Sequence, residues 1–343
     1  MRIGRTYTPP MGTPNGIAEL QPVELNGYPQ WLLIRGQDVS KPLLLFLHGG
    51  PGESNMWLAH YTMKELEQHF VCVNWDQRGT GRSFRPGPPA KSMTIDQFVK
   101  DAIALIELLR SRFGQQKVLL LGHSWGSMLA MKVAAARPDL LYAVIGMGQV
   151  VDMKCGEDLS YQYVLECAHS EHNRKAIRIL EQLGGADTYR KDGKFVQRRW
   201  LVHYGGMMQA LDMGAVVSIL LNAPECSIAD CIRGLTMRDM KFSCRQLGDE
   251  MMGVNFLQEI PELSVPVFFF AGRYDYTTPC VLVEQFYASL HAPYKKLIWF
   301  EHSAHMPHME EPEKFQRELI AVADEFCCEK EPHALKEVYN EYS

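Results

Sequence analysis

The sequence has no long apolar run and no block of like charges. No segment of its 343 residues approaches the roughly 20 consecutive apolar residues that a membrane-spanning helix needs. The net charge is −5, and the 35 basic side chains are dispersed among 40 acidic ones, which gives no basic footprint for nucleic acid. We therefore expect a protein that binds neither membranes nor nucleic acids.

Cysteine is present, but not with the spacing of a disulfide framework or a metal site. The nine cysteines are odd in number and scattered, with no Cys-x-x-Cys pair, so we expect reduced thiols and a cytoplasmic protein. The first residues, Met1 to Tyr7, have no apolar core typical of a signal peptide. His169 and His172 could ligate a metal in principle, yet no nearby cysteine or carboxylate pattern completes a site. We expect neither a metal nor an organic cofactor.

Strands and helices alternate along most of the chain. After about 20 residues that we expect to run over the surface, Asn26-Gly27 lies between two apolar stretches and predicts a hairpin at the start of the sheet. Residues 94–113 have the periodicity of a crossover helix. Continuous apolar runs, typical of strands covered on both faces, occur at 43–47, 71–75, 118–121, 141–147 and 265–270. This alternation predicts an α/β fold with a mostly parallel central sheet flanked by helices.

The alternation stops near residue 151 and resumes about 110 residues later. The intervening sequence has helical patterns without strands. We therefore predict a core domain formed by residues 1–150 and 263–343, and a helical cap domain formed by residues 151–262 and inserted before the last strands.

A strand-turn-helix pattern surrounds Ser124. The apolar run from Val118 turns into Gly122-His123-Ser124-Trp125-Gly126 and then into helix formers. This matches Gly-x-Ser-x-Gly, in which a serine is held on a strained corner so that its hydroxyl projects above the sheet. The glycines are required because side chains there would collide with neighbouring backbone. We predict that Ser124 is a nucleophile.

A serine nucleophile needs a base to take its proton and an acid to orient that base. Asp275 follows the strand at 265–270, and His305 follows a last predicted strand at 297–300. The chain order Ser, Asp, His, with room for one helix between acid and base, fits this arrangement. Asp152 is the alternative acid, and Asp76 is expected to serve its own loop.

His302 and His308 flank His305 at three-residue spacing and could be mistaken for a metal cluster. We choose His305 as the base because it follows the small residue Ala304, whereas His302 belongs to the end of the strand. Pro312 is expected to start the last helix.

A glycine-rich loop, His48-Gly49-Gly50-Pro51-Gly52, follows the strand at 43–47. So many glycines leave backbone N–H groups open to a ligand, and the loop lies at the sheet edge where α/β proteins bind ligands. We expect Gly49 to contact the substrate.

This loop, the segment Asp76-Gln77-Arg78-Gly79-Thr80-Gly81-Arg82-Ser83 and the motif around Ser124 together resemble α/β-hydrolase-fold serine hydrolases, and more closely the proline iminopeptidase (prolyl aminopeptidase) group. The resemblance covers about residues 22–150 and 264–326. It implies Ser124, Asp275 and His305 as a catalytic triad and the backbone N–H groups of Gly50 and Trp125 as an oxyanion hole.

Members of that group hold the substrate's ammonium with acids of the cap, one of them within a Trp-x-x-Trp-Glu pattern that does not occur between residues 151 and 262. We expect other cap carboxylates to take this role. Glu225 and Glu250 are preferred, because each lies where the helical pattern breaks, near Pro224 and Gly248. Further cap acids include Glu157, Asp158, Glu166, Glu171, Asp212, Asp239 and Asp249.

The sequence thus predicts a serine hydrolase that cleaves a small amide or ester through an acyl-enzyme. The resemblance favours release of an amino-terminal residue from a small-molecule or short-peptide substrate. One alternative is a carboxylesterase or lactonase with the same triad, and another is a ligand receptor with little turnover. We set aside an epoxide hydrolase, because such enzymes have an aspartate nucleophile where this chain has Ser124. The oligomeric state is not determined by the sequence.

Overall fold

A computed structural model describes residues 7–84, 87–185, 193–209 and 213–327. An eight-stranded sheet forms its centre, in the order β1-β2-β4-β3-β5-β6-β7-β8. The strands are β1 (Ile17–Leu25), β2 (Tyr28–Gly36), β3 (Leu43–Leu47), β4 (Val71–Asp76), β5 (Val118–His123), β6 (Leu141–Met147), β7 (Val267–Gly272) and β8 (Lys295–Phe300). All neighbours from β4 to β8 pair in parallel, and β2 pairs antiparallel with β1 and β4. The predicted mostly parallel sheet is confirmed.

The hairpin that begins the sheet turns at Asn26 and Gly27, as predicted. Their φ angles are +48° and +72°, which asparagine and glycine tolerate better than other residues, and Leu25 pairs with Tyr28 across the turn. The expectation that the first 20 residues precede the sheet is wrong, because β1 already begins at Ile17. Only Ile17 and Leu25, the two ends of this edge strand, are fully buried, so its sequence lacks a continuous apolar run.

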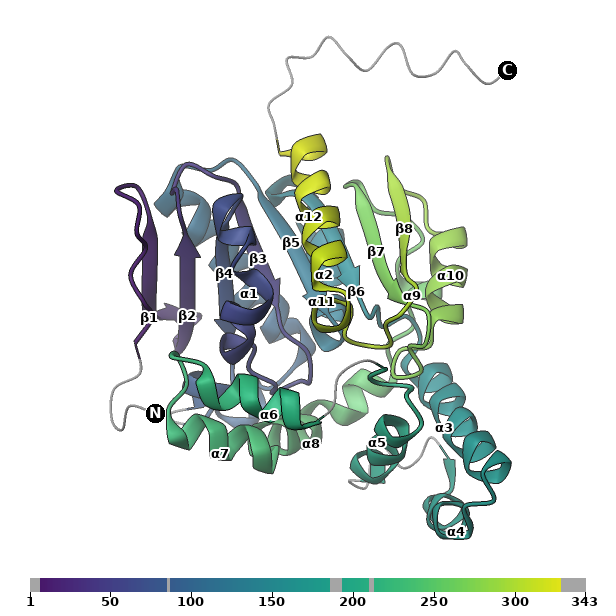
Figure 1. Cartoon of the computed structure of the whole chain (residues 1–343). Coiled ribbons are helices and arrows are strands. Elements are labelled where there is room, and N and C mark those ends of the chain that lie inside the picture. The colour runs from purple at the N-terminus through teal and green to yellow at the C-terminus, as the bar shows by residue number, and fades with distance from the viewer. Residues whose placement is uncertain (1–6, 85–86, 186–192, 210–212, 328–343) are drawn as a thin grey trace, which may run out of the picture.

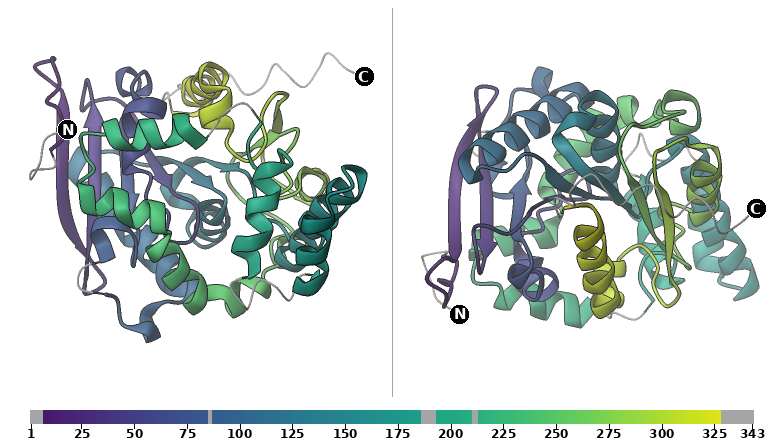
Figure 2. Two further views of the ribbon diagram at one scale, coloured as in Figure 1. Left: turned by 60° about the horizontal axis from the view of Figure 1, so that its bottom comes forward. Right: turned by 90° about the horizontal axis from the view of Figure 1, so that it is seen from above.

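Helices cover both faces of the sheet (Figures 1 and 2). The helices of the core are α1 (Ile95–Phe113), α2 (Trp125–Ala136), α10 (Cys280–Ser289), α11 (Pro307–Glu310) and α12 (Pro312–Phe326). Short helical turns are η1 (Met56–Leu58), η2 (Ala59–Met63), η3 (Leu66–Gln68), η4 (Gly81–Phe84), η5 (Ala90–Ser92) and η6 (Pro138–Leu140). Alternate residues of the central strands point to the two faces of the sheet. Leu45 belongs to the apolar cluster that includes residues of α1, α2 and α10, and Phe46 belongs to the cluster that includes residues of α12.

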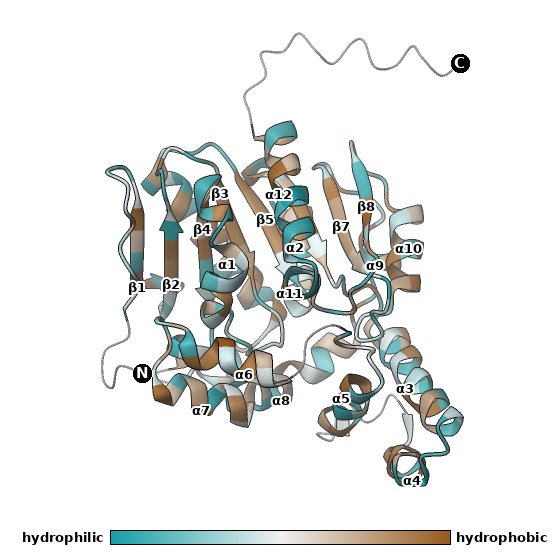
Figure 3. Cartoon of the chain, in the orientation of Figure 1, coloured by the Kyte–Doolittle hydropathy of each residue, from teal (hydrophilic) through white to brown (hydrophobic). Residues whose placement is uncertain are grey.

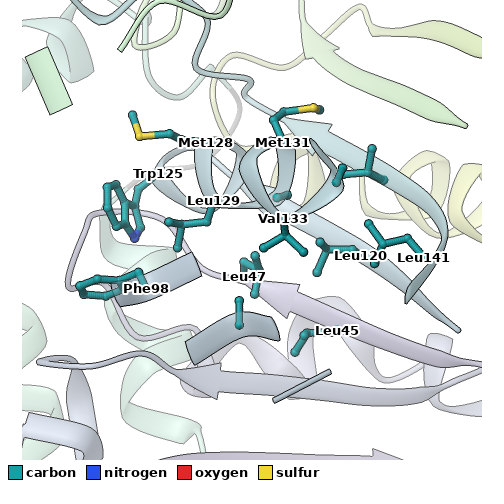
Figure 4. Packing of buried hydrophobic residues seen from close by; sticks show 14 of the residues in the cluster. Leu45, Leu47, Phe98, Leu120, Trp125, Met128, Leu129, Met131, Val133 and Leu141 are labelled. Atoms are coloured by element: carbon teal, nitrogen blue, oxygen red, sulfur yellow. The ribbon is translucent and has the colours of Figure 1, made fainter. Parts of the chain in front are cut away.

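Helix α2, which follows Ser124, is buried over most of its length between the sheet and α1. Trp125, Leu129 and Val133 pack against Leu47 and Phe98, and the Trp125 and Phe98 rings meet edge to face at 5.4 Å (Figure 4). Figure 3 shows the central strands coloured as hydrophobic along most of their length. The turn that carries Ser124 is therefore anchored on both sides by close-packed apolar side chains.

Between β6 and β7 the described chain is helical. The helices are α3 (Met153–Ser170), α4 (Arg174–Leu183), α5 (Gly193–His203), α6 (Met213–Asn222), α7 (Ile228–Thr236), α8 (Arg238–Met252) and α9 (Phe256–Glu259). Helices α3 to α5 gather near β7 and β8, and α6 to α8 lie below β1 to β4 (Figure 1). The division into a core and a cap domain stays a prediction. None of the helices in the described ranges is both long and apolar enough to cross a membrane.

Candidate active site

Ser124 lies between β5 and α2 in a conformation that few residues adopt. Its φ and ψ are +55° and −119°, and its amide donates to the carbonyl of Met147 on the neighbouring strand at 2.9 Å. A Cβ at Gly122 would collide with the Gly126 carbonyl, and one at Gly126 with the Leu47 carbonyl. The two flanking glycines therefore let strand, turn and helix approach closely enough to hold this corner, and the Ser124 side chain is partly exposed at its apex.

Asp275 and His305 lie together in the structure. His305 Nδ1 donates to Asp275 Oδ2 at 2.8 Å, and both side chains are 97% buried. Asp275 also accepts the amides of Thr277 and Thr278 at 2.8 and 2.9 Å and the Thr278 hydroxyl at 2.9 Å. Four donors thus fix the carboxylate, and the bond at Nδ1 leaves Nε2 of His305 as the basic nitrogen.

The backbone of His305 is held from two sides. Its amide donates to the carbonyl of Met207 at 3.0 Å, and its carbonyl accepts from Nε2 of His123 at 2.8 Å. Burial lowers the pKa of His123 well below its ordinary value, and a positive charge on His305 would lower it further. His123 is therefore a neutral donor that positions the loop carrying His305.

Two glycines bring these parts together. A Cβ at Gly49 would lie 3.3 Å from the Cβ of Ser124, and a Cβ at Gly148 would lie 2.7 Å from Cε1 of His305. Gly148 follows Met147, whose carbonyl holds the Ser124 amide. The backbone around Ser124 therefore contacts both the glycine-rich loop and the imidazole of His305.

A hydrogen-bonded chain fixes the glycine-rich loop against the turn at Ser124. The Trp125 indole N–H donates to the side-chain Oε1 of Gln77 at 2.8 Å, and the backbone amide of Gln77 donates to Nε2 of His48 at 3.2 Å. His48 Nδ1 then donates to the Gly49 carbonyl at 2.8 Å, and burial lowers the pKa of His48 to about 4. Neutral His48 thus orients the peptide bond between Gly49 and Gly50.

The predicted oxyanion donors meet the requirements of such a site. Gly50 has a φ of +112°, in the region that favours glycine, and Trp125 is the first residue of α2, where helical amides have no partner within the helix. No hydrogen bond to either amide occurs among the described residues. Both amides are therefore free to bind an anion.

The helical segment covers the site at two places. A Cβ at Gly52 would lie 2.6 Å from the carbonyl oxygen of Asp239, so the start of α8 rests on the glycine-rich loop. On the other side, the Gly206 carbonyl accepts the Tyr276 amide at 2.9 Å, next to Asp275. The Tyr276 ring stacks on Tyr163 of α3 at 3.7 Å.

The preferred cap acids have other partners. Glu225 is buried, and its Oε1 accepts from His60 Nε2 at 2.7 Å and from the Thr8 hydroxyl at 2.9 Å. Glu250 is exposed, and its Oε2 accepts the Ile95 amide at 3.0 Å at the start of α1. The position of each at a break in the helical pattern did not indicate these contacts.

Of the further cap acids, Asp239 is buried and accepts the Gly81 amide at 2.9 Å, Glu157 pairs with Arg198, and Asp212 lies outside the described residues.

The alternative candidates are engaged elsewhere. Asp152 caps α3 by accepting the Cys155 amide at 2.9 Å and also binds Asn255. Asp76 accepts the Arg82 amide at 2.8 Å, and burial raises its pKa to about 7. His302 is exposed. His308 is buried among aromatic rings, and burial lowers its pKa to about 3. Within the described ranges no group of His, Cys, Asp and Glu could hold a metal ion.

The chain belongs to the alpha/beta hydrolase fold family, whose sequence model matches residues 42–312. It is 37% identical over 306 residues to a probable aminopeptidase of Bacillus subtilis, YbaC, covering 88% of this chain and 95% of that protein. It is 26% identical over 295 residues to a proline iminopeptidase of Heyndrickxia coagulans, covering 82% and 89%. The protein is therefore a hydrolase of this fold.

Solved structures support the same architecture. A proline iminopeptidase of Mycobacterium smegmatis matches with a TM-score of 0.62 at 17% identity, over 90% of this chain and 98% of that one. An esterase of Exiguobacterium antarcticum matches with a TM-score of 0.61 at 18% identity, over 90% and 100%. At these identities the likeness supports the fold alone.

Proposed function

We propose that the protein is a serine aminopeptidase that releases an amino-terminal residue, with proline a candidate, from short peptides or amides. The observation that carries the chemistry is the buried Asp275–His305 pair, 2.8 Å apart, beside a serine held in a strained turn. The preference for a free amino terminus is supported by the aminopeptidase and proline iminopeptidase names of the sequence relatives.

The mechanism follows from the arrangement of these groups. Nε2 of His305 takes the proton of the Ser124 hydroxyl as its oxygen attacks the substrate carbonyl, and Asp275 stabilises the imidazolium that forms. The amides of Gly50 and Trp125 bind the oxyanion. His305 then protonates the leaving amine, and the acyl-enzyme remains on Ser124.

Hydrolysis of the acyl-enzyme reverses these roles. His305 takes a proton from water, the hydroxide attacks the acyl carbon, and Ser124 leaves with the proton returned by His305. No step requires a metal or an organic cofactor. The scattered, odd number of cysteines supports a cytoplasmic location for this reaction.

The test compares a proline or aminoacyl arylamide with its N-acetylated form. An aminopeptidase must pair the substrate ammonium in a partly desolvated site, so it should lose nearly all turnover on the blocked compound. Equal rates on both, or activity confined to short acyl esters, would assign the protein to the esterases. A single turnover ending in a stable adduct would instead indicate a ligand receptor.

A further inference from the structure

Glu53 follows the glycine-rich loop directly and lies beside the oxyanion donor Gly50. A Cβ at Gly50 would be 3.3 Å from the Cβ of Glu53 and 2.8 Å from its amide nitrogen. The carboxylate therefore originates next to the amide that is proposed to bind the substrate's carbonyl oxygen. No pattern in the sequence singled out this residue.

Two buried acids of the core have cationic partners, whereas Glu53, which is half-buried, has none among the described residues. Asp101 binds Arg78 at 2.9 Å, and Glu67 binds Arg35 at 2.6 Å. Throughout the described ranges, the Glu53 carboxylate has neither a hydrogen-bond donor nor a basic side chain within ion-pair distance. A half-buried carboxylate without a protein partner is a candidate for binding a cationic group of a ligand.

The surroundings of Glu53 are those of the catalytic centre. Gly49 of the same loop approaches Ser124, with 3.3 Å between a Cβ added there and the Cβ of Ser124. Burial raises the pKa of the Glu53 carboxyl, and a positive charge on His305 would lower it. The side chain is nevertheless partly exposed, and its oxygens are not sealed as one oxygen of Glu225 and one of Asp239 are. A ligand at the site can therefore reach the Glu53 carboxylate.

Covalent geometry limits where a substrate's ammonium can lie. In an aminoacyl compound the amino nitrogen is two bonds, or about 2.5 Å, from the carbonyl carbon that is attacked. With that carbon at Ser124 and its oxygen at Gly50, the ammonium lies close to the glycine-rich loop. The Glu53 side chain begins beside Gly50 and can reach an ammonium at this position, whereas Glu225 is already bonded to His60 and Thr8.

We propose that Glu53 binds the amino-terminal ammonium of the substrate. This inference rests on the proposed aminopeptidase function and gives it a specificity residue in the core, in place of an acid from the cap. The ligand is a primary or secondary ammonium one carbon away from the scissile carbonyl.

The experiment measures a selectivity ratio, kcat/KM on a prolyl or alanyl arylamide divided by kcat/KM on the matching acyl arylamide without the amine. Glu53→Gln keeps the size of the side chain and removes its charge, and should lower this ratio about 100-fold, because the ammonium loses its counter-charge. Glu65→Gln is the matched control. Glu65 is exposed, and within the described part of the chain its carboxylate is bonded only to Gln68, so the ratio of this variant should stay at the wild-type value. Thermal unfolding verifies that each variant is folded.

Four results would overturn the inference. An unchanged ratio in folded Glu53→Gln, from an enzyme that itself prefers the free amine, would exclude Glu53 alone and leave the aminopeptidase function standing. Equal losses on both substrates would indicate that Glu53 supports the catalytic step and does not bind the ammonium. A fall in the ratio for Glu225→Gln but not Glu53→Gln would return ammonium binding to the cap. A wild-type enzyme without preference for the amine would overturn the proposed function, and this inference with it.

Discussion

Gly148→Ala tests how closely the turn after β6 positions the base. The added Cβ would lie 2.7 Å from Cε1 and 2.8 Å from Nδ1 of His305. Ordinary contact begins at 3.4 Å, so the ring must retreat by about 0.7 Å. Both the Asp275 bond and the approach to Ser124 depend on that position, and a displacement near 1 Å costs on the order of 10²-fold in rate. We expect kcat to fall about 30- to 100-fold.

The same change also costs stability, because alanine at the φ of +53° found for Gly148 is strained by about 1–2 kcal/mol. Gly184→Ala separates the two effects: Gly184 has a φ of +79° at the end of α4, with nothing within 4 Å of the added Cβ. The urea midpoint of Gly184→Ala should fall by about as much as that of Gly148→Ala, while its kcat stays at the wild-type value. Steady-state kinetics and urea unfolding measure both. Wild-type kcat in Gly148→Ala would refute the placement of His305 against this turn.

Three further outcomes are expected. His305→Gln should lose at least ~10³-fold in kcat while His302→Gln keeps its activity, with chelators without effect; the opposite pattern would reassign the base. Burial raises the pKa of Asp76 from 3.8 to about 7, so the folded state binds the extra proton and stability falls as pH rises from about 4 to 7. Asp76→Asn should therefore reduce the loss of unfolding free energy between pH 5 and pH 8 by roughly 2–3 kcal/mol in urea titrations, and an unchanged loss would contradict a buried, protonated Asp76. Glu250→Ala should cost about 1 kcal/mol of stability, because the Ile95 amide in the first turn of α1 loses its acceptor, and leave KM unchanged; a raised KM would place Glu250 at the substrate.

Local patterns in the sequence predicted most of the core. Helix α1 begins after Thr94, whose hydroxyl accepts the Gln97 amide, and ends at Gly114 with a φ of +64°, as its capping residues indicate. The hairpin at Asn26 and the strands with continuous apolar runs could be predicted in the same way. These elements are determined by residues within a few positions of one another.

The partners of the cap acids could not be predicted, because they depend on packing between segments far apart in the chain. Glu225 contacts His60 and Thr8, which are 165 and 217 residues away. A break in the helical pattern shows that Glu225 is near a helix end, but not where that end lies in space. The unpartnered state of Glu53 is likewise a property of what surrounds it in the folded chain.

The most direct test of the catalytic account is covalent labelling by a fluorophosphonate probe, followed by peptide mapping. A serine activated by His305 beside free oxyanion donors should react at Ser124 within the peptide Gly122-His123-Ser124-Trp125-Gly126. Folded Ser124→Ala should not be labelled and should lose at least ~10³-fold in turnover. Labelling at another residue, or undiminished labelling of Ser124→Ala, would contradict the acyl-enzyme mechanism.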